Sequence, residues 1–383
     1  MSDVIPLGRP SLGEVELAAV AEVFRSGWAA GQGPAGRDFE SRFAQLVDDR
    51  DVVAVSSGTA ALHLALEVLG VGTGDEVVVA DYGFPAAASL VARTGATPVF
   101  ADVLAGTGLV DPRAVDALVG PRTVGIVAVD VGGLPADYAE LTAVADRYGL
   151  FLVEDAACAA GATYRGAPAG ALAPVACFSF HGRKGVTCGE GGALVAADAK
   201  VAARARRLSG FGLEPALARS GMLSAVPVFA EPGLNLKMSD IAAAIMSAQL
   251  GRLPGLLERR TQIAARYAGL LADAEQLTCP DVPDDRTHAW QTYAVTLAPS
   301  VDRDAVATTL RRHGVQCSFA HYAAHRQPAF NGRSACPVSA DLHRRQLALP
   351  MHADLSTDQV ERVCDALRAT LAAAPAKSST SRK

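Results

Sequence analysis

The segment DVVAVSSGTAALHLALEVLG, residues 51–70, contains the strand-and-helix unit on which the fold prediction rests. Its apolar start, DVVAVSS, predicts a buried strand, and GTAALHLALEVLG predicts a helix that follows directly. The first turn of that helix holds Gly58, Thr59 and Ala60. A helix start has free backbone N–H groups, and small residues let an anion approach them, so this turn could bind a phosphate. The same residues could instead form only a helix N-cap.

The alternation of strand and helix patterns continues to residue 157. Regular alternation of this kind predicts an α/β fold with three layers, in which a mostly parallel sheet has helices on both faces. Ligands bind such folds at the carboxyl ends of the strands. The predicted strands are EVVVA (76–80), TPVFADV (97–103), TVGIVAVD (123–130) and LFLVEDAA (150–157), and the predicted helices are FPAAASLVARTG (84–95), DPRAVDALV (111–119) and ADYAELTAVADRYG (136–149).

Three features fall at the carboxyl ends of predicted strands: the turn at Gly58, the ring of Phe84 and the pair Glu154-Asp155. Asp155 needs an explanation, because a carboxylate at the end of a buried strand is costly unless it faces a positive partner. Asp155 could face a bound ligand, form a structural salt bridge or cap a helix. We expect Glu154 to have the structural role.

The stretch FSFHGRKGVTCGEGG, residues 178–192, places Lys184 between a strand pattern and a glycine-rich turn. Lysine is rare in this chain, whereas arginine is abundant. An amine can lose its proton through desolvation and cationic neighbours such as Arg183, and it can then form a Schiff base with an aldehyde. Lys184 is therefore a candidate reactive group. The stretch alone is equally compatible with a solvated lysine in a turn between strands.

The rest of the chain predicts an N-terminal helical segment and a second domain. Residues 9–47 show two helical patterns joined by a glycine-rich loop. A long helix, capped by Ser239 or Asp240, should bend at Gly251 and Pro254. We place the domain boundary at that bend. The expected parts are a large ligand-binding domain with the N-terminal helical segment (1–250), a smaller C-terminal α+β domain (251–373) and a disordered tail (374–383).

Several helix ends carry recognisable signals. Asp111 should cap the helix that starts at the following proline. Gly314 should close the helix RDAVATTLRRHG, since glycine adopts the left-handed conformation found after a helix end. Ser356 and Gln359 have the spacing of a capping box.

Composition excludes several classes of function. The chain has 383 residues, half of them hydrophobic, so it can bury a large core. Its net charge of -5 argues against a nucleic-acid-binding surface. We find neither a signal peptide nor an apolar stretch suited to a membrane span, so we expect a cytoplasmic protein. The seven cysteines form no CxxC pair, which predicts reduced thiols and no metal site.

Six stretches occur together in the chain: SGTAALHLAL (56–65), FPA with GATPVFADV (84–103), EDAACAAGATYRG (154–166), FSFHGRKGVTCGEGG (178–192), NLKMSDIAAAIMSAQL (235–250) and HYAAHRQPAF (321–330). In this order they resemble the pyridoxal-phosphate (PLP)-dependent sugar aminotransferase family, also called the DegT/DnrJ/EryC1/StrS family. The resemblance extends from Pro10 to Leu371. It implies a fold-type I PLP enzyme.

The resemblance implies a role for each matched position around the cofactor ring. Lys184 would hold PLP as a Schiff base, Asp155 would face the pyridine nitrogen and Phe84 would stack on the ring. Cys158 stands where the family usually has glutamine or histidine near the ring. A contact to the cofactor's 3′-oxygen is therefore expected to be weaker or missing.

The resemblance also implies where the cofactor phosphate binds. The helix start at residues 58–60 and Ser179 would hold it. Asn235 would reach the phosphate of the neighbouring subunit, so the active sites would be shared in a homodimer. Lys237 replaces the arginine that usually follows this asparagine.

Together these roles imply an aminotransferase that uses both the PLP and the pyridoxamine (PMP) form of the cofactor. It would move an amino group from an amino-acid donor, glutamate or glutamine, to a keto-sugar, nucleotide-sugar or cyclitol in secondary-metabolite or glycan biosynthesis. The segments SGWAAGQGPAG (26–36) and HYAAHRQPAF are expected to line the acceptor pocket. The candidate substrate residues are Trp28, His181, His321, Tyr322 and His325.

Two other functions are compatible with the sequence. A member of the same family could have been repurposed for elimination, decarboxylation or cyclisation of an amino-acid-like substrate, and Cys158 would fit such a change. A regulator could retain the fold without turnover, although the intact Lys184 and Asp155 argue against this. No stretch matches the carboxylate-clamping arginine motif of amino-acid aminotransferases, which favours a sugar-like acceptor.

Overall fold

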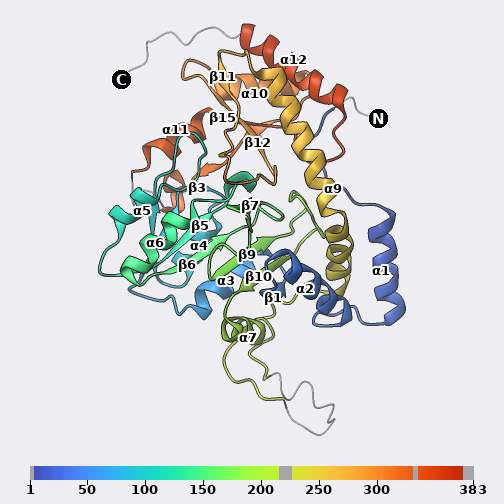
Figure 1. Ribbon diagram of the computed structural model, residues 1–383, viewed down its shortest axis with the longest axis vertical. Coiled ribbons are helices and arrows are strands. Elements are labelled where there is room, and N and C mark those ends of the chain that lie inside the picture. The colour runs from blue at the N-terminus through green and yellow to red at the C-terminus, as the bar shows by residue number, and fades with distance from the viewer. Residues whose placement is uncertain (1–3, 215–226, 331–334, 374–383) are drawn as a thin grey trace.

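The computed structural model describes residues 4–214, 227–330 and 335–373. Figure 1 shows two parts, with the long helix α9 running from one to the other. The predicted tail, 374–383, lies outside the described residues.

The helices are α1 (Glu14–Ser26), α2 (Pro34–Leu46), α3 (Gly58–Val68), α4 (Ala86–Arg93), α5 (Pro112–Leu118), α6 (Tyr138–Tyr148), α7 (Ala199–Leu208), α9 (Asp240–Leu271), α10 (Arg303–Arg312), α11 (Pro337–Arg345) and α12 (Thr357–Ala373). The strands are β1 (Asp51–Val55), β2 (Glu76–Ala80), β3 (Tyr82–Gly83), β4 (Thr97–Ala101), β5 (Thr123–Val129), β6 (Phe151–Asp155), β7 (Thr163–Tyr164), β8 (Ala167–Pro168), β9 (Val175–Ser179), β10 (Gly192–Ala196), β11 (Leu277–Thr278), β12 (Tyr293–Leu297), β13 (Ser318–Phe319), β14 (Tyr322–Ala323) and β15 (Gln346–Leu349).

The large sheet has seven strands in the order β1-β10-β9-β6-β5-β2-β4. Strand β10 is antiparallel to both neighbours, and the other four pairings are parallel. The predicted mostly parallel sheet is therefore confirmed. Strand β1 lies at an edge of the sheet, where it pairs only with β10. The sequence of β1 does not predict this pairing.

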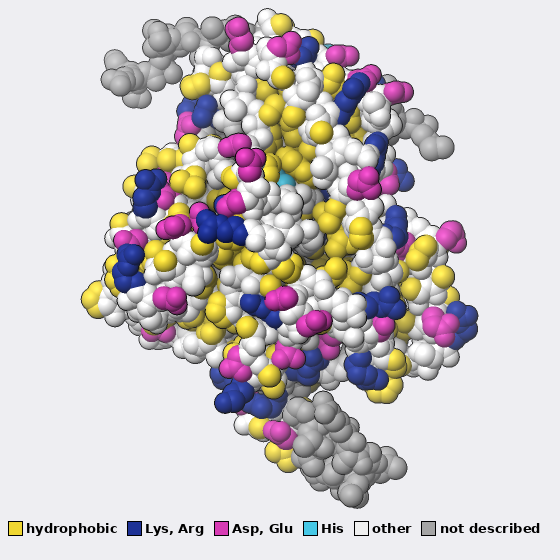
Figure 2. Space-filling view, in the orientation of Figure 1, with side chains coloured by type: hydrophobic (Ala, Val, Ile, Leu, Met, Phe, Trp, Pro, Cys, Tyr) yellow, Lys and Arg dark blue, Asp and Glu magenta, His cyan; other side chains and the backbone are white. Residues whose placement is uncertain are grey.

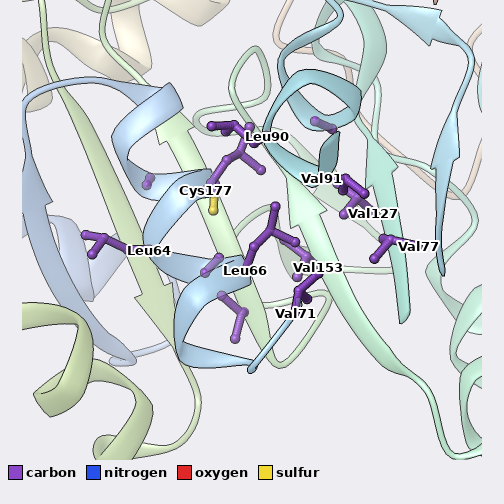
Figure 3. Close-up of a cluster of buried hydrophobic side chains, with 14 of the residues drawn as sticks. Leu64, Leu66, Val71, Val77, Leu90, Val91, Val127, Val153 and Cys177 are labelled. Atoms are coloured by element: carbon purple, nitrogen blue, oxygen red, sulfur yellow. The ribbon is translucent and has the colours of Figure 1, made fainter. Parts of the chain in front are cut away.

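Alternate residues of the strands face opposite helical layers. On one face, Val77, Val127 and Val153 pack against Leu66 of α3 and Val91 of α4 (Figure 3). The adjacent strand residues point to the other face, which α2, α5, α6 and part of α9 cover. Because side chains alternate along a strand, a sheet covered on both faces needs nearly continuous apolar strands. The three predicted layers are present.

A second, four-stranded sheet forms the smaller part of the molecule. Its order is β11-β12-β15-β13, and all its pairings are antiparallel. Helices α10 and α12 and the C-terminal half of α9 share its core, which includes Tyr267 and Leu367. Ile5 joins this core as well and forms a bridge with Val315. The N-terminal residues thus pack with the smaller part of the structure.

Helix α9 continues without interruption through Gly251 and Pro254, so residue 250 lies inside a helix of 32 residues. Pro254 is on the exposed side of α9. Of the two predicted caps, Ser239 is the actual one, because its hydroxyl accepts the N–H of Ala242 at 3.2 Å. The Asp240 carboxylate instead accepts backbone N–H groups at the start of α2. This contact ties α2 to α9.

The other predicted helix ends are confirmed. Asp111 accepts the N–H of Arg113 at 3.0 Å. Gly314 has a φ of 76° and directly follows His313, the C-cap residue of α10. Ser356 and Gln359 exchange two hydrogen bonds of 3.0 and 3.2 Å, as a capping box requires.

Candidate active site

Asp155 and Lys184 lie at the carboxyl edge of the large sheet. Strand β6 ends at Asp155, which pairs in register with Cys177 of β9. The Asp155 side chain is buried and accepts the N–H of Ala157 at 3.2 Å. Burial raises the pKa of Asp155, and the positive charge of Lys184 acts in the opposite direction. A carboxylate in this position is stabilised by any further cation that binds beside it.

Lys184 belongs to a tight turn after β9. Its N–H donates to the carbonyl of His181 at 2.8 Å. Its amine, Nζ, donates to Sγ of Cys158 at 3.0 Å. The position that the resemblance assigns to a ring contact is thus occupied by a thiol that touches the candidate reactive amine.

The turn is supported from behind by Arg260 of α9, a residue that the sequence did not single out. Its Nη2 donates to the carbonyl of Gly185 at 2.7 Å. Any Cβ at Gly185 would lie 2.4 Å from Nη1 of Arg260, so a larger residue here would displace the guanidinium. The long helix therefore fixes the residue next to Lys184. No short-range pattern in the sequence connects these two positions.

Gly58 and Ser179 form a narrow cradle at the start of α3. A Cβ on Gly58 would lie only 2.7 Å from Cβ of Ser179. The hydroxyl of Ser57 accepts the N–H of Ala60 at 3.0 Å, so this amide is already engaged in the N-cap. The exposed residue Thr59 lies between these groups in the same first turn. The predicted N-cap is therefore present, with the small-residue cradle beside it, and phosphate binding at this helix start stays a prediction.

Phe84 and Tyr322 are brought together by a pairing that joins distant parts of the chain. Strands β3 and β14 pair antiparallel, with Tyr322 opposite Gly83. The ring of Phe84 is 64% exposed, and its centroid lies 6.1 Å from that of Tyr322 in an edge contact. A large aromatic ring left this exposed offers a surface for a flat ligand.

These residues fit PLP. Lys184 supplies an amine for its aldehyde, and Asp155 supplies a buried carboxylate for its ring nitrogen. The exposed ring of Phe84 suits its aromatic plane. The cradle between Gly58 and Ser179, which a side chain at position 58 would fill, suits its phosphate at a helix start.

Asn235 and Trp28, which were also predicted to belong to the site, are both exposed. Asn235 is exposed, forms a bridge with Gly210 and accepts a hydrogen bond from Lys237 at 2.7 Å. Trp28 is 52% exposed and packs against Gly33 near the start of α9. Within the described part of the chain, neither residue forms a hydrogen bond with Lys184, whose amine bonds to Cys158.

The three histidines predicted to contact substrate have different environments. His181 lies 3.6 Å from the exposed carboxylate of Glu190. His325 is engaged with buried Asp81 through both its backbone N–H and its Nδ1, each at 2.7 Å. A ring bound in this way anchors the segment to Asp81. His321 lines a cleft described below.

Glu154 has the structural role that we expected for it. Its carboxylate accepts the N–H groups of Gly170 and Leu172 at 2.7 and 3.1 Å. Burial raises its pKa to about 7. The neighbouring Asp130, which the sequence did not suggest, is also buried, and burial and Glu154 raise its pKa well above the ordinary range.

The fold and these residues define the protein class: a fold-type I PLP-dependent enzyme. The family model of the DegT/DnrJ/EryC1/StrS aminotransferases matches residues 10–368, and the chain belongs to this family. It is accordingly a PLP-dependent aminotransferase.

Solved structures of high similarity cover nearly the whole chain. The aminotransferase TlmJ from Streptoalloteichus hindustanus is 38% identical, with a TM-score of 0.91 over 97% of this chain and 99% of that one. DesV of S. venezuelae is 34% identical, with a TM-score of 0.85 over 92% and 93%. The PMP form of a putative sugar aminotransferase from Streptococcus pneumoniae, Spr1654, is 27% identical, with a TM-score of 0.91 over 96% and 98%.

The surface and the helices add two observations. Figure 2 shows acidic and basic side chains mixed over the visible face, without a continuous basic patch. Among the described residues, no helix is both long and apolar enough to cross a membrane.

Proposed function

We propose that this enzyme transfers an amino group from glutamate or glutamine to a keto group on a sugar, nucleotide-sugar or cyclitol. The observation that carries the proposal is the juxtaposition of Lys184, Asp155 and the Gly58 cradle in a member of this aminotransferase family. The description of the pneumococcal relative as a putative sugar aminotransferase supports the sugar-like acceptor. Glutamate and glutamine remain the expected donors.

Bound PLP supplies the electron sink of the reaction and carries the amino group between donor and acceptor. Lys184 would hold the cofactor, and its amine, when free, would carry a proton from the α-carbon of the amino donor to the former aldehyde carbon of PLP. Asp155 keeps the positive charge of the cofactor ring in place, because a buried carboxylate is stabilised by that charge. Cys158 is positioned to donate to or accept from the Lys184 amine while this amine is free.

We also propose a homodimer with shared active sites. Asn235 is exposed, and the one side-chain hydrogen bond it forms within the described part of its own chain comes from Lys237. An exposed asparagine carboxamide can still donate to a phosphate on a neighbouring subunit. The role of Asn235 therefore depends on a second copy of the chain.

The attachment site is tested by borohydride reduction of the PLP-loaded protein followed by peptide mapping. We expect the label on Lys184. A label on Lys200 or Lys237, or no label, would contradict the assignment.

The transfer is tested in two steps. Glutamate and glutamine are first offered to the PLP form, and the absorbance change that marks conversion to the PMP form is recorded. The PMP form then receives keto-sugars, keto-cyclitols and simple 2-keto acids. We expect the PLP spectrum to return with sugar-like ketones. Return only with keto acids rejects the sugar-like acceptor, and return with none favours the repurposed chemistry that the Cys158 contact suggests.

A further inference from the structure

A cleft of about 570 Å³ opens beside the active site, between the two parts of the molecule. The loops after β4 and β5, which contain Gly106 and Gly132, form one wall. Thr296 of β12 and Gln346 of β15 belong to the opposite wall. The cleft thus lies at the carboxyl edge of the large sheet, where ligands of α/β proteins bind.

His321 lines this cleft, and the charge of Lys184 acts on its imidazole. Burial lowers the pKa of His321 to about 4, and the positive charge of Lys184 contributes to the same shift. An edge contact with Tyr82, with ring centroids 5.4 Å apart, orients the imidazole. A Cβ on Gly132 would lie 3.5 Å from Nε2, so the glycine leaves space in front of this nitrogen. Among the described residues, neither ring nitrogen of His321 has a hydrogen-bond partner.

His288 provides a second imidazole whose hydrogen position is defined. Its Nδ1 accepts the N–H of Trp290 at 2.8 Å, so Nε2 carries the hydrogen and is a donor. The rings of His288 and Trp290 stack with centroids 4.0 Å apart. Trp290 has a φ of 50°, an unusual conformation for a bulky residue that tends to occur near functional sites. Burial lowers the pKa of His288 to about 3.

The charges in the cleft argue against an anionic ligand. Two of the three guanidinium nitrogens of Arg345 are engaged, because Nε donates to Asp341 at 2.7 Å and Nη1 donates to the carbonyl of Leu297 at 2.9 Å. Asp281 lies exposed on the lining. A diphosphate calls for unpaired cationic donors, and among the described residues that line the cleft Arg345 is the one lysine or arginine. Neutral imidazoles instead match hydroxyl groups, which both donate and accept.

We propose that this cleft receives the ring of an uncharged, polyhydroxylated acceptor, a free sugar or a cyclitol, and not a nucleoside diphosphate sugar. Its hydroxyls pair with the ring nitrogens of His321 and accept from Nε2 of His288. The inference rests on the proposed function, since it names the acceptor class for the same active site.

The test is isothermal titration of the PLP-loaded protein with myo-inositol and D-glucose as uncharged probes and uridine diphosphate as a charged one. We expect at least one uncharged probe to bind, and uridine diphosphate not to bind in the cleft. Gly106→Trp places a large side chain at an exposed lining position where a Cβ meets nothing within 4 Å. We expect it to weaken binding at least 10-fold. Gly8→Trp, at an equally open position outside the cleft, is the matched control and should bind normally.

His321→Phe removes both polar atoms from the cleft while keeping a ring against Tyr82, and it should weaken binding to a similar degree. If the wild type binds neither uncharged probe, or if Gly106→Trp binds them as tightly as the wild type, the assignment of the cleft is wrong. Binding of uridine diphosphate that Gly106→Trp abolishes also rejects it. Conversion of PLP to PMP by glutamate is followed in parallel by absorbance. Failure of that conversion with intact probe binding rejects glutamate as the donor and still supports the cleft as a polyol site.

Discussion

Gly58→Ala tests the cradle that is proposed to hold the cofactor phosphate. The added Cβ would lie 2.7 Å from Cβ of Ser179 and 3.2 Å from the carbonyl oxygen of Phe178, whereas ordinary contacts begin at 3.4 Å. The start of α3 must therefore move away from β9 by roughly 0.7 Å. Overpacking of this kind costs about 1–3 kcal/mol, and the better helix propensity of alanine returns up to about 1 kcal/mol.

We expect the movement to weaken PLP binding at least 10-fold, since about 1.4 kcal/mol corresponds to a factor of ten. The assay is titration of the cofactor-free protein with PLP, together with thermal unfolding. Gly255→Ala is the matched control, because Gly255 is an exposed position within α9 where a Cβ meets nothing within 4 Å. This control should leave PLP affinity unchanged. If Gly58→Ala binds PLP as tightly as the wild type, binding of the cofactor phosphate does not depend on the close approach of Gly58 to Ser179.

Three further predictions concern other parts of the site. Asp155→Asn should retain some PLP but convert it with glutamate at least about 100-fold more slowly, since removing a buried ionic partner costs about 3–5 kcal/mol. An unimpaired rate in stopped-flow absorbance would exclude this role. Mixing Lys184→Ala with Asn235→Ala subunits should restore activity, because a mixed dimer has one site with neither lesion. If no activity returns under conditions of proven subunit exchange, each site is built from one chain. Glu154, whose folded pKa is raised to about 7 from 4.5, gives stability below pH 4.5 that is lost as the pH rises through 7. The Tm should therefore fall less between pH 6 and 8 in Glu154→Gln than in the wild type, and equal falls would show that this carboxyl does not titrate there.

The parts of the fold that could be predicted depend on local patterns. The alternation of strands and helices between residues 51 and 157 follows from hydrophobic periodicity, and the caps at Asp111 and Ser356 follow from side chains that bond to nearby backbone. The edge position of β1 could not be predicted in the same way. Strand β1 reaches the sheet through β10, which begins at Gly192, and such a long-range pairing leaves no periodic signal in either strand.

The same distinction between local patterns and long-range contacts applies to the residues of the active site. A carboxylate at a strand end and a lysine before a glycine-rich turn are visible in the sequence, so Asp155 and Lys184 could be selected. His325 could not be separated from His321, because the contact of His325 with Asp81 joins residues 244 positions apart. Only the pairing of β3 with β14 determines which of the two histidines is engaged there and which lines the cleft.

The position of Arg260 explains why α9 has to remain continuous where the sequence predicted a bend. Its N-terminal half packs in the core of the large sheet, and its C-terminal half packs in the core of the small sheet. Arg260 lies between these halves and donates to the carbonyl of Gly185. Its Nε and Nη1 meet no acceptor among the described residues, and burial lowers its pKa to about 10. A buried cation with so few partners is costly, and a helix that ended at Pro254 would not hold it against the turn. The unbroken helix therefore couples the position of the residue after Lys184 to the packing of both parts of the molecule.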